Sequence, residues 1–360
     1  MRILIVKLSS LGDVVHAMAS VQDIRQAFPY TQIDWVVERG FAPLVLRCKG
    51  VHRVIPCELR RWRKAMFSPE TRQAWQLFKT DLRQDAYDAV IDLQGLAKSA
   101  LVSRLARLAP GGKRYGMANQ TEGSSFEAPA RWVADVAITL PAHSHAVTRS
   151  RQLCAQALGY TLPFYMSFGL LALMDKGLPD TKKIAFRTGL NGIVALVHGT
   201  SRADKEWPLD HWRALGERLN AAGYIVALPH GSATEEAVCH QIAAGLAHTQ
   251  VWPRLALDAL TDSLANCTGV IGVDSGLSHI AVALDLAHVQ IYNFDTAWRT
   301  GPLAEQPANA GGSAARQVSV FEPPTPSVDS VWQAWEAVAA AAAQARPPTT
   351  YFRASGLGSL

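Results

Sequence analysis

Asp13 is the first residue of the chain whose position suggests chemistry. It lies in the stretch Ser-Ser-Leu-Gly-Asp-Val-Val-His at residues 9–16, directly after the apolar run Ile3–Val6. Four apolar residues in a row are typical of a fully buried parallel strand, and open α/β sheets place their ligands at the carboxyl ends of such strands. The Asp13 carboxylate could therefore take a proton from an acceptor hydroxyl. It could equally serve only to cap the helix that begins at Val14, and the residues alone leave both hypotheses open.

A second candidate site follows the apolar run Val194–Val197, where the sequence continues His-Gly-Thr-Ser-Arg-Ala-Asp-Lys-Glu-Trp-Pro. Thr200 and Ser201 offer hydroxyls in a small turn, and Lys205 comes shortly after them. Turn hydroxyls and backbone N–H groups suit a phosphate, and a lysine supplies a point charge for it. The alternative is a loop in which the hydroxyls only close the turn and Lys205 is solvated.

A third candidate site is the sequence Gly-Val-Asp-Ser-Gly-Leu-Ser-His-Ile-Ala at residues 272–281. A strand, then Asp274-Ser275-Gly276, then a helix would place free N–H groups and the positive end of a helix dipole at the carboxyl edge of a sheet, which favours a diphosphate. Asp274 could accept hydrogen bonds from sugar hydroxyls. His279, one turn into the helix, could face the same ligand or could be a structural residue.

Positive charge is concentrated in the first half of the chain. The net charge is +5, but residues 1–175 hold 22 Lys and Arg against 14 Asp and Glu, whereas residues 176–360 hold 13 against 16. Arg60, Arg61, Arg63 and Lys64 occupy four of five consecutive positions, so we expect some to point into a cleft and others to water. The alternative is a solvated surface. An anionic partner is expected for this half; nucleic acid, an anionic membrane surface and a phosphorylated or carboxylated substrate all fit the charge alone.

Several classes of site and of protein are disfavoured by what the sequence lacks. It contains no Asp-x-Asp pair, no H-E-x-x-H, no P-loop and no G-x-S-x-G, so we expect neither a metal nor a cofactor. Beyond Trp62, no aromatic residue interrupts the basic cluster, which argues against nucleic acid. No apolar run is long enough to span a membrane, no signal peptide is expected, and five scattered cysteines are typical of a reduced cytosolic protein.

Apolar runs that alternate with helical patterns predict an α/β fold with two Rossmann-like, doubly wound parallel sheets that face a cleft, and a C-terminal helix. The expected strands after Ile3–Val6 are Ile33–Glu38, Arg53–Pro56, Ala89–Leu93 and Val136–Leu140, then Gly192–His198, Tyr224–Pro229, Val270–Asp274 and His288–Tyr292. The clearest expected helices are Val14–Ala27, Thr71–Arg83, Ala233–Ala243 and Ser330–Ala345, with a loop at Met117–Ala130 and a linker at Phe164–Lys183. We predict domains at residues 1–170 and 171–325, a C-terminal helix at 326–346 and a flexible tail at 347–360.

The three candidate sites, together with Ile-Asp-Leu-Gln-Gly-Leu-Ala-Lys-Ser-Ala at residues 91–100, resemble the ADP-heptose lipopolysaccharide heptosyltransferase family. The resemblance covers roughly residues 1–345, with the motifs in the same order and spacing. It implies a glycosyltransferase B-type fold, independence of metal and inversion at the anomeric carbon. It also implies that the first domain binds the acceptor and carries the catalytic base, and that the second binds ADP-heptose.

The family's functional residues carry over to matching positions in this chain. The resemblance implies that Asp13 is the general base and that Lys205 stabilises the departing ADP. It further implies a donor site in which Thr200, Ser201 and Lys205 hold the diphosphate, Glu235 the ribose, Leu255 the adenine, Asp274 the heptose, and the backbone of Ser275, Gly276 and Leu277 with His279 the phosphates. For Glu235 the alternative is a charge at the start of the helix at Ala233–Ala243.

The basic cluster at residues 60–64 favours, within this family, transfer of the first heptose to the Kdo of Kdo2-lipid A, because that acceptor is anionic. Members that act on a later inner-core sugar are the alternative, and a non-catalytic nucleotide-sugar or nucleic-acid binding protein is a distant one. The resemblance leads us to expect a further acceptor-binding cation after Tyr115, yet residues 117–126 contain none, so we expect Lys113 and Arg114 to substitute. The expected location is the cytoplasmic face of the inner membrane of a Gram-negative bacterium, with peripheral contact to the anionic surface.

Overall fold

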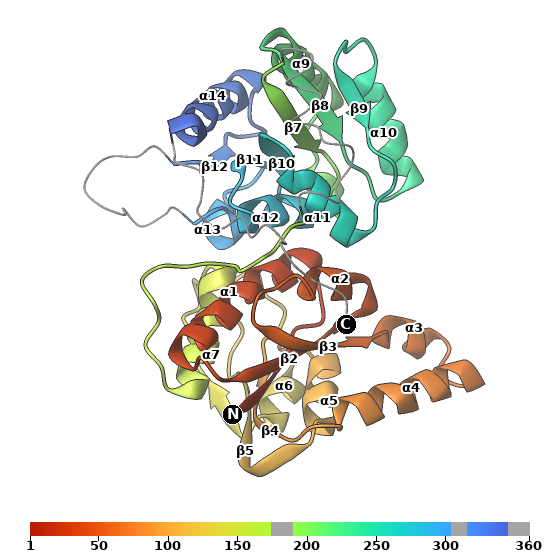
Figure 1. The fold of residues 1–360 in the computed structure, drawn as a ribbon, viewed down its shortest axis with the longest axis vertical. Coiled ribbons are helices and arrows are strands. Elements are labelled where there is room, and N and C mark those ends of the chain that lie inside the picture. Colours follow the sequence, from red (N-terminus) through yellow and green to blue (C-terminus); the bar gives the residue numbers. More distant parts are fainter. Residues whose placement is uncertain (174–189, 304–314, 345–360) are drawn as a thin grey trace, which may run out of the picture.

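The protein, seen here in a computed structural model that describes residues 1–173, 190–303 and 315–344, contains two six-stranded parallel sheets (Figure 1). In the first sheet the strand order is β3-β2-β1-β4-β5-β6. Its strands are β1 (Arg2–Val6), β2 (Gln32–Glu38), β3 (Val51–Cys57), β4 (Tyr87–Asp92), β5 (Leu108–Met117) and β6 (Val136–Ile138). The order reverses between β1 and β4, and this is where doubly wound sheets bind ligands.

The second sheet repeats this topology, in the order β12-β11-β10-β7-β8-β9, and it reverses between β7 and β10. Its strands are β7 (Gly192–Val197), β8 (Tyr224–Leu228), β9 (Thr249–Val251), β10 (Gly269–Val273), β11 (Ala287–Tyr292) and β12 (Gln317–Phe321). The predicted fold class of two doubly wound parallel sheets is thereby confirmed. The three candidate sites identified from the sequence follow β1, β7 and β10, which are strands at the two reversal points.

Helices cover both faces of the first sheet. Ile3 and Ile5 of β1 pack toward α1 and α7, whereas Leu4 and Val6 pack toward α3, α4 and α5. The helices of this half are α1 (Leu11–Ala27), α2 (Ala42–Val45), α3 (Leu59–Lys64), α4 (Pro69–Leu82), α5 (Ala97–Leu105), α6 (Ala128–Val133) and α7 (Ala146–Leu158). Burial on both faces explains why β1 is apolar without alternation.

Helices of the second half cover its sheet in the same way. They are η2 (Ala203–Lys205), α9 (Leu209–Ala221), α10 (Ala233–Ala243), α11 (Leu257–Ala265), α12 (Gly276–Ala283), α13 (Ala297–Thr300) and α14 (Val328–Gln344). The expected C-terminal helix is α14, and it packs on the second sheet, with Trp335 buried in the same apolar cluster as Trp212. The expected tail at 347–360 and the linker beyond residue 173 lie outside the described residues.

The apolar core continues from one half of the molecule to the other. Ile3 and Val14 of the first half belong to the same buried cluster as Ile193 and Ile280 of the second. Across this junction the amino ends of α1 and α12 meet so closely that a Cβ on Gly276 would lie 2.6 Å from the Leu11 side chain. The carboxyl ends of β1 and β10 therefore face the same junction.

Three short or irregular strands were not predicted from the sequence. β5 contains Pro110, Gly111 and Gly112 and is only partly buried, so it lacks an apolar run; β9 and β12 are the edge strands of the second sheet. The expected loop at Met117–Ala130 overlaps the end of β5 and the beginning of α6. Edge strands pair on one side only, so the pattern that marks a buried strand is weak there.

Candidate active site

α1 begins at Leu11 and not at Val14 as expected, so Asp13 is not the N-cap residue: Ser10 is, and Asp13, three residues later, bonds back to it in a capping box. Its Oδ2 accepts hydrogen bonds from the Ser10 Oγ at 2.8 Å and the Ser10 backbone N–H at 3.1 Å. Its Oδ1 has only longer contacts, to the Lys7 Nζ at 3.4 Å and the Arg149 guanidinium at 3.9 Å, and the side chain is 36% exposed. Capping thus uses one carboxylate oxygen and leaves the other accessible, so the cap does not exclude the role of base.

Two buried cations that the sequence analysis missed stand beside Asp13. Lys7 directly follows β1 and also donates to the Leu93 carbonyl at 3.2 Å; Arg149, on α7, donates to the Thr121 hydroxyl at 3.1 Å. Although burial opposes ionisation of Asp13, the charge of Lys7 and the hydrogen bonds from Ser10 hold the pKa of this carboxyl well below its usual range. Burial lowers the pKa of Lys7 and of Arg149, whereas the negative charge of Asp13 acts to raise both pKa values.

Asp274, at the carboxyl end of β10, is the second buried carboxylate of the junction. The Lys205 Nζ lies 2.5 Å from its Oδ2, and the His279 Nε2 lies 3.4 Å from its Oδ1. The Thr300 hydroxyl and the Gln290 amide donate to the same Oδ1 at 3.3 and 3.4 Å. Burial raises the pKa of Asp274, but the contacts with His279 and Lys205 outweigh it and hold the pKa well below the usual range. The structure therefore brings together Lys205, Asp274 and His279, as the sequence predicted.

Two buried hydroxyl oxygens, Thr200 Oγ1 and Ser275 Oγ, lie close in sequence to Lys205 and Asp274. Neither has a hydrogen-bond partner among the residues that the structure describes. Ser275 is the N-cap residue of α12, but its side chain makes no capping bond. Buried hydroxyls ordinarily find partners, so these two, beside a lysine and a helix amino terminus, match the donors that a phosphate requires. Ser201 is exposed next to Thr200.

Glu235 and Leu255 lie near the carboxyl ends of β8 and β9. The Glu235 Oε2 accepts from the Gly231 N–H at 2.6 Å, and a Cβ on Gly199 would lie 3.0 Å from the Glu235 carboxyl carbon. Glu235 thus lies in the first turn of α10 and is also adjacent to the turn that follows β7. This position is compatible with both hypotheses, ribose binding and a charge at the start of the helix. Leu255 is half-buried against the shared core, as is Leu277.

The basic cluster on α3 (Arg60, Arg61, Arg63 and Lys64) is exposed in full, because Trp62 alone takes the inward side of this short helix. Arg61 pairs with Glu58 at 3.0 Å. Arg60 lies near Lys98, and burial together with the charge of Arg60 lowers the pKa of Lys98. The Nζ of Lys98, on α5, donates to the Ser9 hydroxyl at 3.0 Å, so Lys98 binds the turn that precedes α1.

Lys113 and Arg114, which were expected to replace the missing loop cation, are not brought to Asp13. Both lie within β5, three or four residues before its carboxyl end. The Arg114 guanidinium binds the carbonyl oxygens of Ser103 and Ala106 at the end of α5, at 2.9 and 3.4 Å. Arg114 therefore has a structural role, and Lys113 is exposed beside it.

A different cation reaches this loop from the second half of the chain. A Cβ on Gly123 would lie 2.8 Å from the Arg299 guanidinium carbon, so α13 packs directly on the loop. Next to it, Trp298 stacks on His143 with ring centroids 3.6 Å apart, and His143 contacts Glu122 at 2.9 Å. Within the described ranges Arg299 has no acidic partner. No sequence signal connects α13 to residues so distant in the chain.

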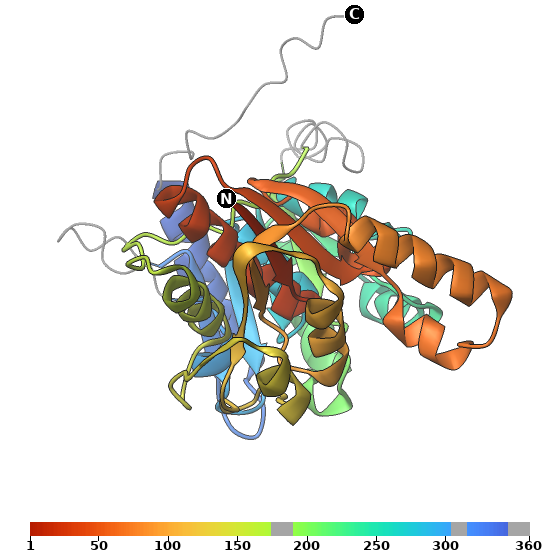
Figure 2. The same cartoon turned by 90° about the horizontal axis from the view of Figure 1, so that it is seen from below.

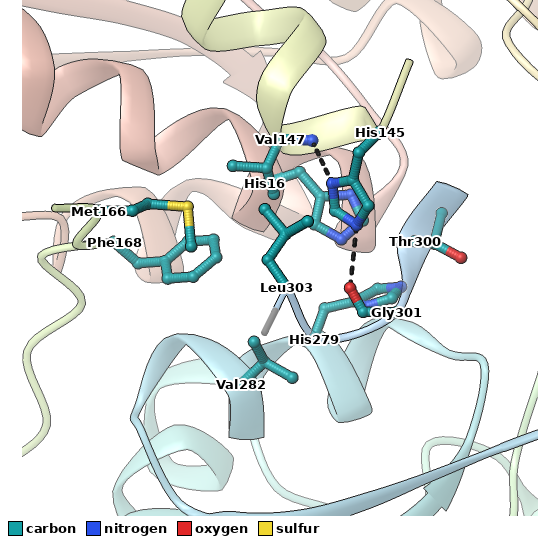
Figure 3. Close-up of a pocket in the computed structure, with 10 residues that line it drawn as sticks. All are labelled: His16, His145, Val147, Met166, Phe168, His279, Val282, Thr300, Gly301 and Leu303. Carbon is teal, nitrogen blue, oxygen red and sulfur yellow. Dashed lines mark hydrogen bonds between the residues drawn. The ribbon is translucent and has the colours of Figure 1, made fainter. Parts of the chain in front are cut away.

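Three buried histidines close the junction between the two halves (Figure 3). The His16 ring lies 4.3 Å from that of His279 and 6.0 Å from that of His145, centroid to centroid. The His145 Nε2 donates to the Gly301 carbonyl, and its Nδ1 accepts from the Val147 N–H. Burial lowers the pKa of His16 well below its usual value and that of His145 to about 4, so both are neutral at pH 7.

The described residues contain neither a group of metal ligands nor a membrane-spanning helix. In the parts of the chain that the structure describes, no three His, Cys, Asp or Glu side chains are grouped as metal ligands. None of the helices in those parts has both the length and the apolarity needed to cross a bilayer.

Residues 75–327 match glycosyltransferase family 9 (heptosyltransferase). The chain belongs to this family of heptosyltransferases. Lipopolysaccharide heptosyltransferase 1 of Escherichia coli (strain K12) is 39% identical over 81% of this chain and 88% of its own length, and that of Pseudomonas aeruginosa is 38% identical over 86% and 84%. Lipooligosaccharide heptosyltransferase 2 of Haemophilus ducreyi is 27% identical over 85% and 87%.

A solved structure agrees with the sequence relatives. The E. coli heptosyltransferase WaaC with ADP has a TM-score of 0.78 and 33% identity to this heptosyltransferase, and covers 93% of this chain and 99% of its own. The predicted enzyme class, a glycosyltransferase of lipopolysaccharide synthesis, is confirmed at this level.

Proposed function

We propose that this heptosyltransferase moves L-glycero-D-manno-heptose from ADP-heptose to the Kdo of Kdo2-lipid A, with inversion and without a metal. The observation that carries the proposal is that two carboxylates, each beside its own cations, lie on opposite sides of one junction. Asp13 lies among cations on one side, and Asp274, Lys205 and two unpartnered hydroxyls lie on the other. We assign acceptor binding to residues 1–170, donor binding to 171–325, and the helix at 326–346 to the support of the donor half.

The donor half would hold ADP-heptose by its diphosphate. Thr200 and Ser201, the Ser275–Leu277 backbone and His279 are the proposed partners of the phosphates. Glu235 would bind the ribose, Leu255 would line the adenine pocket, and Asp274 would accept from heptose hydroxyls. Lys205 would be shared between Asp274 and a phosphate, which places its charge where negative charge grows on the departing ADP. In support, one solved form of the E. coli relative contains ADP-2-deoxy-2-fluoro heptose.

The acceptor half would supply the base. Asp13 Oδ1 takes the proton of the acceptor hydroxyl as that oxygen forms a bond to the anomeric carbon and the bond to ADP breaks on the opposite face, which inverts the centre. Base catalysis of this kind contributes about 10²–10⁴ in rate. Lys7 and Arg149 would act as positioning residues, since they keep Asp13 ionised and oriented.

Cations from both halves would bind the anionic acceptor. Arg60, Arg61, Arg63 and Lys64 lie on α3, Lys98 lies between α3 and Ser9, and Arg299 takes the place of the missing loop cation. The exposed cations of α3 would also hold the enzyme on the cytoplasmic face of the inner membrane of a Gram-negative bacterium, where anionic lipids attract basic segments.

The test is an assay of ADP release from ADP-heptose with O-deacylated Kdo2-lipid A, and with the same acceptor after it has received a heptose. We expect turnover with the first acceptor, little with the second, and no loss of rate in EDTA. Arg63→Ala should raise the acceptor KM and leave the donor KM nearly unchanged. Turnover with the heptosylated acceptor alone would assign the enzyme to a later inner-core step, and complete inactivation by EDTA would refute the metal-free scheme.

A further inference from the structure

The turn between α3 and α4 exposes two adjacent apolar side chains. Met66 is 53% and Phe67 79% exposed. Seen from below, α3 and α4 form a hairpin that projects from the body of the protein, and this turn lies at its outer end (Figure 2). Single exposed apolar residues are common on protein surfaces, but a consecutive Met-Phe pair at the end of a projecting element is not explained by packing.

Aromatic side chains pack between the two helices of the hairpin. Trp62 of α3 is buried against Trp75 and Phe78 of α4, with ring centroids 5.6 and 5.4 Å apart. Ser68 fixes the beginning of α4, since its hydroxyl accepts from the Thr71 N–H at 3.1 Å. The aromatic contacts fill the inside of the hairpin and leave Met66 and Phe67 outside.

The charged residues that precede this turn on α3 are positive and, within the described residues, mostly without acidic partners, whereas Glu70 and Arg72 follow the turn on α4. Arg63 and Lys64 immediately precede it, and neither forms an ion pair among the residues that the structure describes. Arg61 pairs with Glu58 on the same segment. An apolar tip next to unpaired cations is complementary to one kind of surface, an anionic lipid layer, where apolar side chains enter the interface and cations meet the head groups.

We propose that the α3–α4 tip inserts Met66 and Phe67 into the interfacial layer of an anionic phospholipid membrane while Arg63 and Lys64 contact its head groups. This proposal rests on the proposed function only in that the acceptor is taken to be a membrane lipid. Arg60, at the base of the hairpin, lies near Lys98, and Lys98 donates to the hydroxyl of Ser9 in the turn before α1. Asp13 lies in the first turn of α1, so an inserted tip would place this end of the first sheet on the side of a membrane-bound acceptor.

Vesicle sedimentation tests the proposal without any glycosyl transfer. The full chain should bind phosphatidylglycerol–phosphatidylcholine vesicles more tightly than pure phosphatidylcholine vesicles, and less tightly in high salt. Phe67→Ser should weaken binding roughly tenfold, since the apolar contact is lost. Tyr30→Ser is the matched control: Tyr30 is 96% exposed in the turn between α1 and β2, outside the hairpin, so its loss should change nothing. Equal binding of Phe67→Ser and the wild type would overturn the proposal.

A label at the tip gives a second, direct measurement. All five native cysteines are buried, and burial raises the pKa of each to about 12, so a thiol-reactive fluorophore would label Met66→Cys selectively while Phe67 is kept. Its emission should shift to the blue on addition of anionic vesicles. An unchanged spectrum, as expected if the tip docks on a protein instead, would refute insertion. Because neither readout uses a sugar donor, failure here leaves the proposed transfer reaction standing, and the ADP-release assay tests that separately.

Discussion

Replacement of Asp13 by Asn separates the two hypotheses for this residue, helix cap and general base. The amide oxygen of the substituted side chain can still accept from the Ser10 N–H and hydroxyl, which in the wild type lie 3.1 and 2.8 Å from Oδ2. The cap therefore loses only its charge, which costs a few tenths to about 1 kcal/mol. Lys7 also loses its counter-charge at 3.4 Å, but Asp13 is 36% exposed and solvent screens part of this pair. We expect a total destabilisation of about 1–2 kcal/mol, or a few degrees in Tm.

The effect of Asp13→Asn on the rate should be much larger. Loss of the base removes about 10²–10⁴ in kcat, which corresponds to roughly 3–5 kcal/mol in the activation free energy. The assay is ADP release at saturating donor and acceptor, with the donor Kd measured by calorimetry. We expect that Kd to stay within about twofold, since Asp13 touches no proposed donor residue.

The dependence of stability on pH follows from the direction in which folding moves the pKa of Asp13. The pKa of Asp13 is lower in the folded protein than in the unfolded chain, so its contribution to stability is complete above the ordinary Asp pKa of about 4 and is lost as the pH falls through the folded value. The Tm difference between the wild type and Asp13→Asn should thus be constant from pH 6 to 8 and shrink below about pH 4. Titration of Asp13 should produce no acid limb in kcat/KM above that pH.

Ser10→Ala is the matched control, because it removes one capping hydrogen bond and keeps the carboxylate. It should lower the Tm by a similar amount, with activity within about tenfold of the wild type. An Asp13→Asn enzyme that turns over at nearly the wild-type rate, or a Ser10→Ala enzyme that is equally inactive, would return Asp13 to the role of a cap.

Three further predictions concern the donor and acceptor groups. Lys205→Ala should lower kcat by about 10²–10³ and weaken ADP binding, because a charge-assisted phosphate contact is lost. The Tm should also fall, because Asp274 loses the partner that lies 2.5 Å away. Stopped-flow turnover measures kcat, and calorimetry measures ADP binding and the Tm. Thr200→Val and Ser275→Ala should each raise the Kd for ADP roughly three- to tenfold at an unchanged or higher Tm, since each hydroxyl is buried without a partner; a lowered Tm and unchanged Kd would show a structural role instead. Arg299→Ala should raise the acceptor KM about tenfold at constant donor KM, and Arg299→Lys should recover part of it; equal losses in both variants would contradict a role for the charge.

The parts of the fold and site that could be predicted are those written in short stretches of chain. β1, β7 and β10 are runs of apolar residues because helices cover both of their faces, and each leads directly into a turn with polar side chains. The residues of these turns, including Asp13 and Lys205, could be identified without coordinates. β5 could not be predicted, since its Pro and Gly residues break the apolar pattern and only its pairing with β4 and β6 in the folded sheet makes it a strand.

Hydrophobic period and turn chemistry are local properties, so the amino-acid sequence is enough to predict two doubly wound sheets with polar turns after their central strands. The charges that surround the Asp13 carboxylate, in contrast, are set by tertiary packing. Arg149 arrives on α7, and α13 of the other half brings Arg299 to Gly123, whereas Lys113 and Arg114, nearer in sequence, stay within β5. Such contacts depend on how helices that are distant in sequence pack around a shared apolar core, so the spacing of residues along the chain does not predict them.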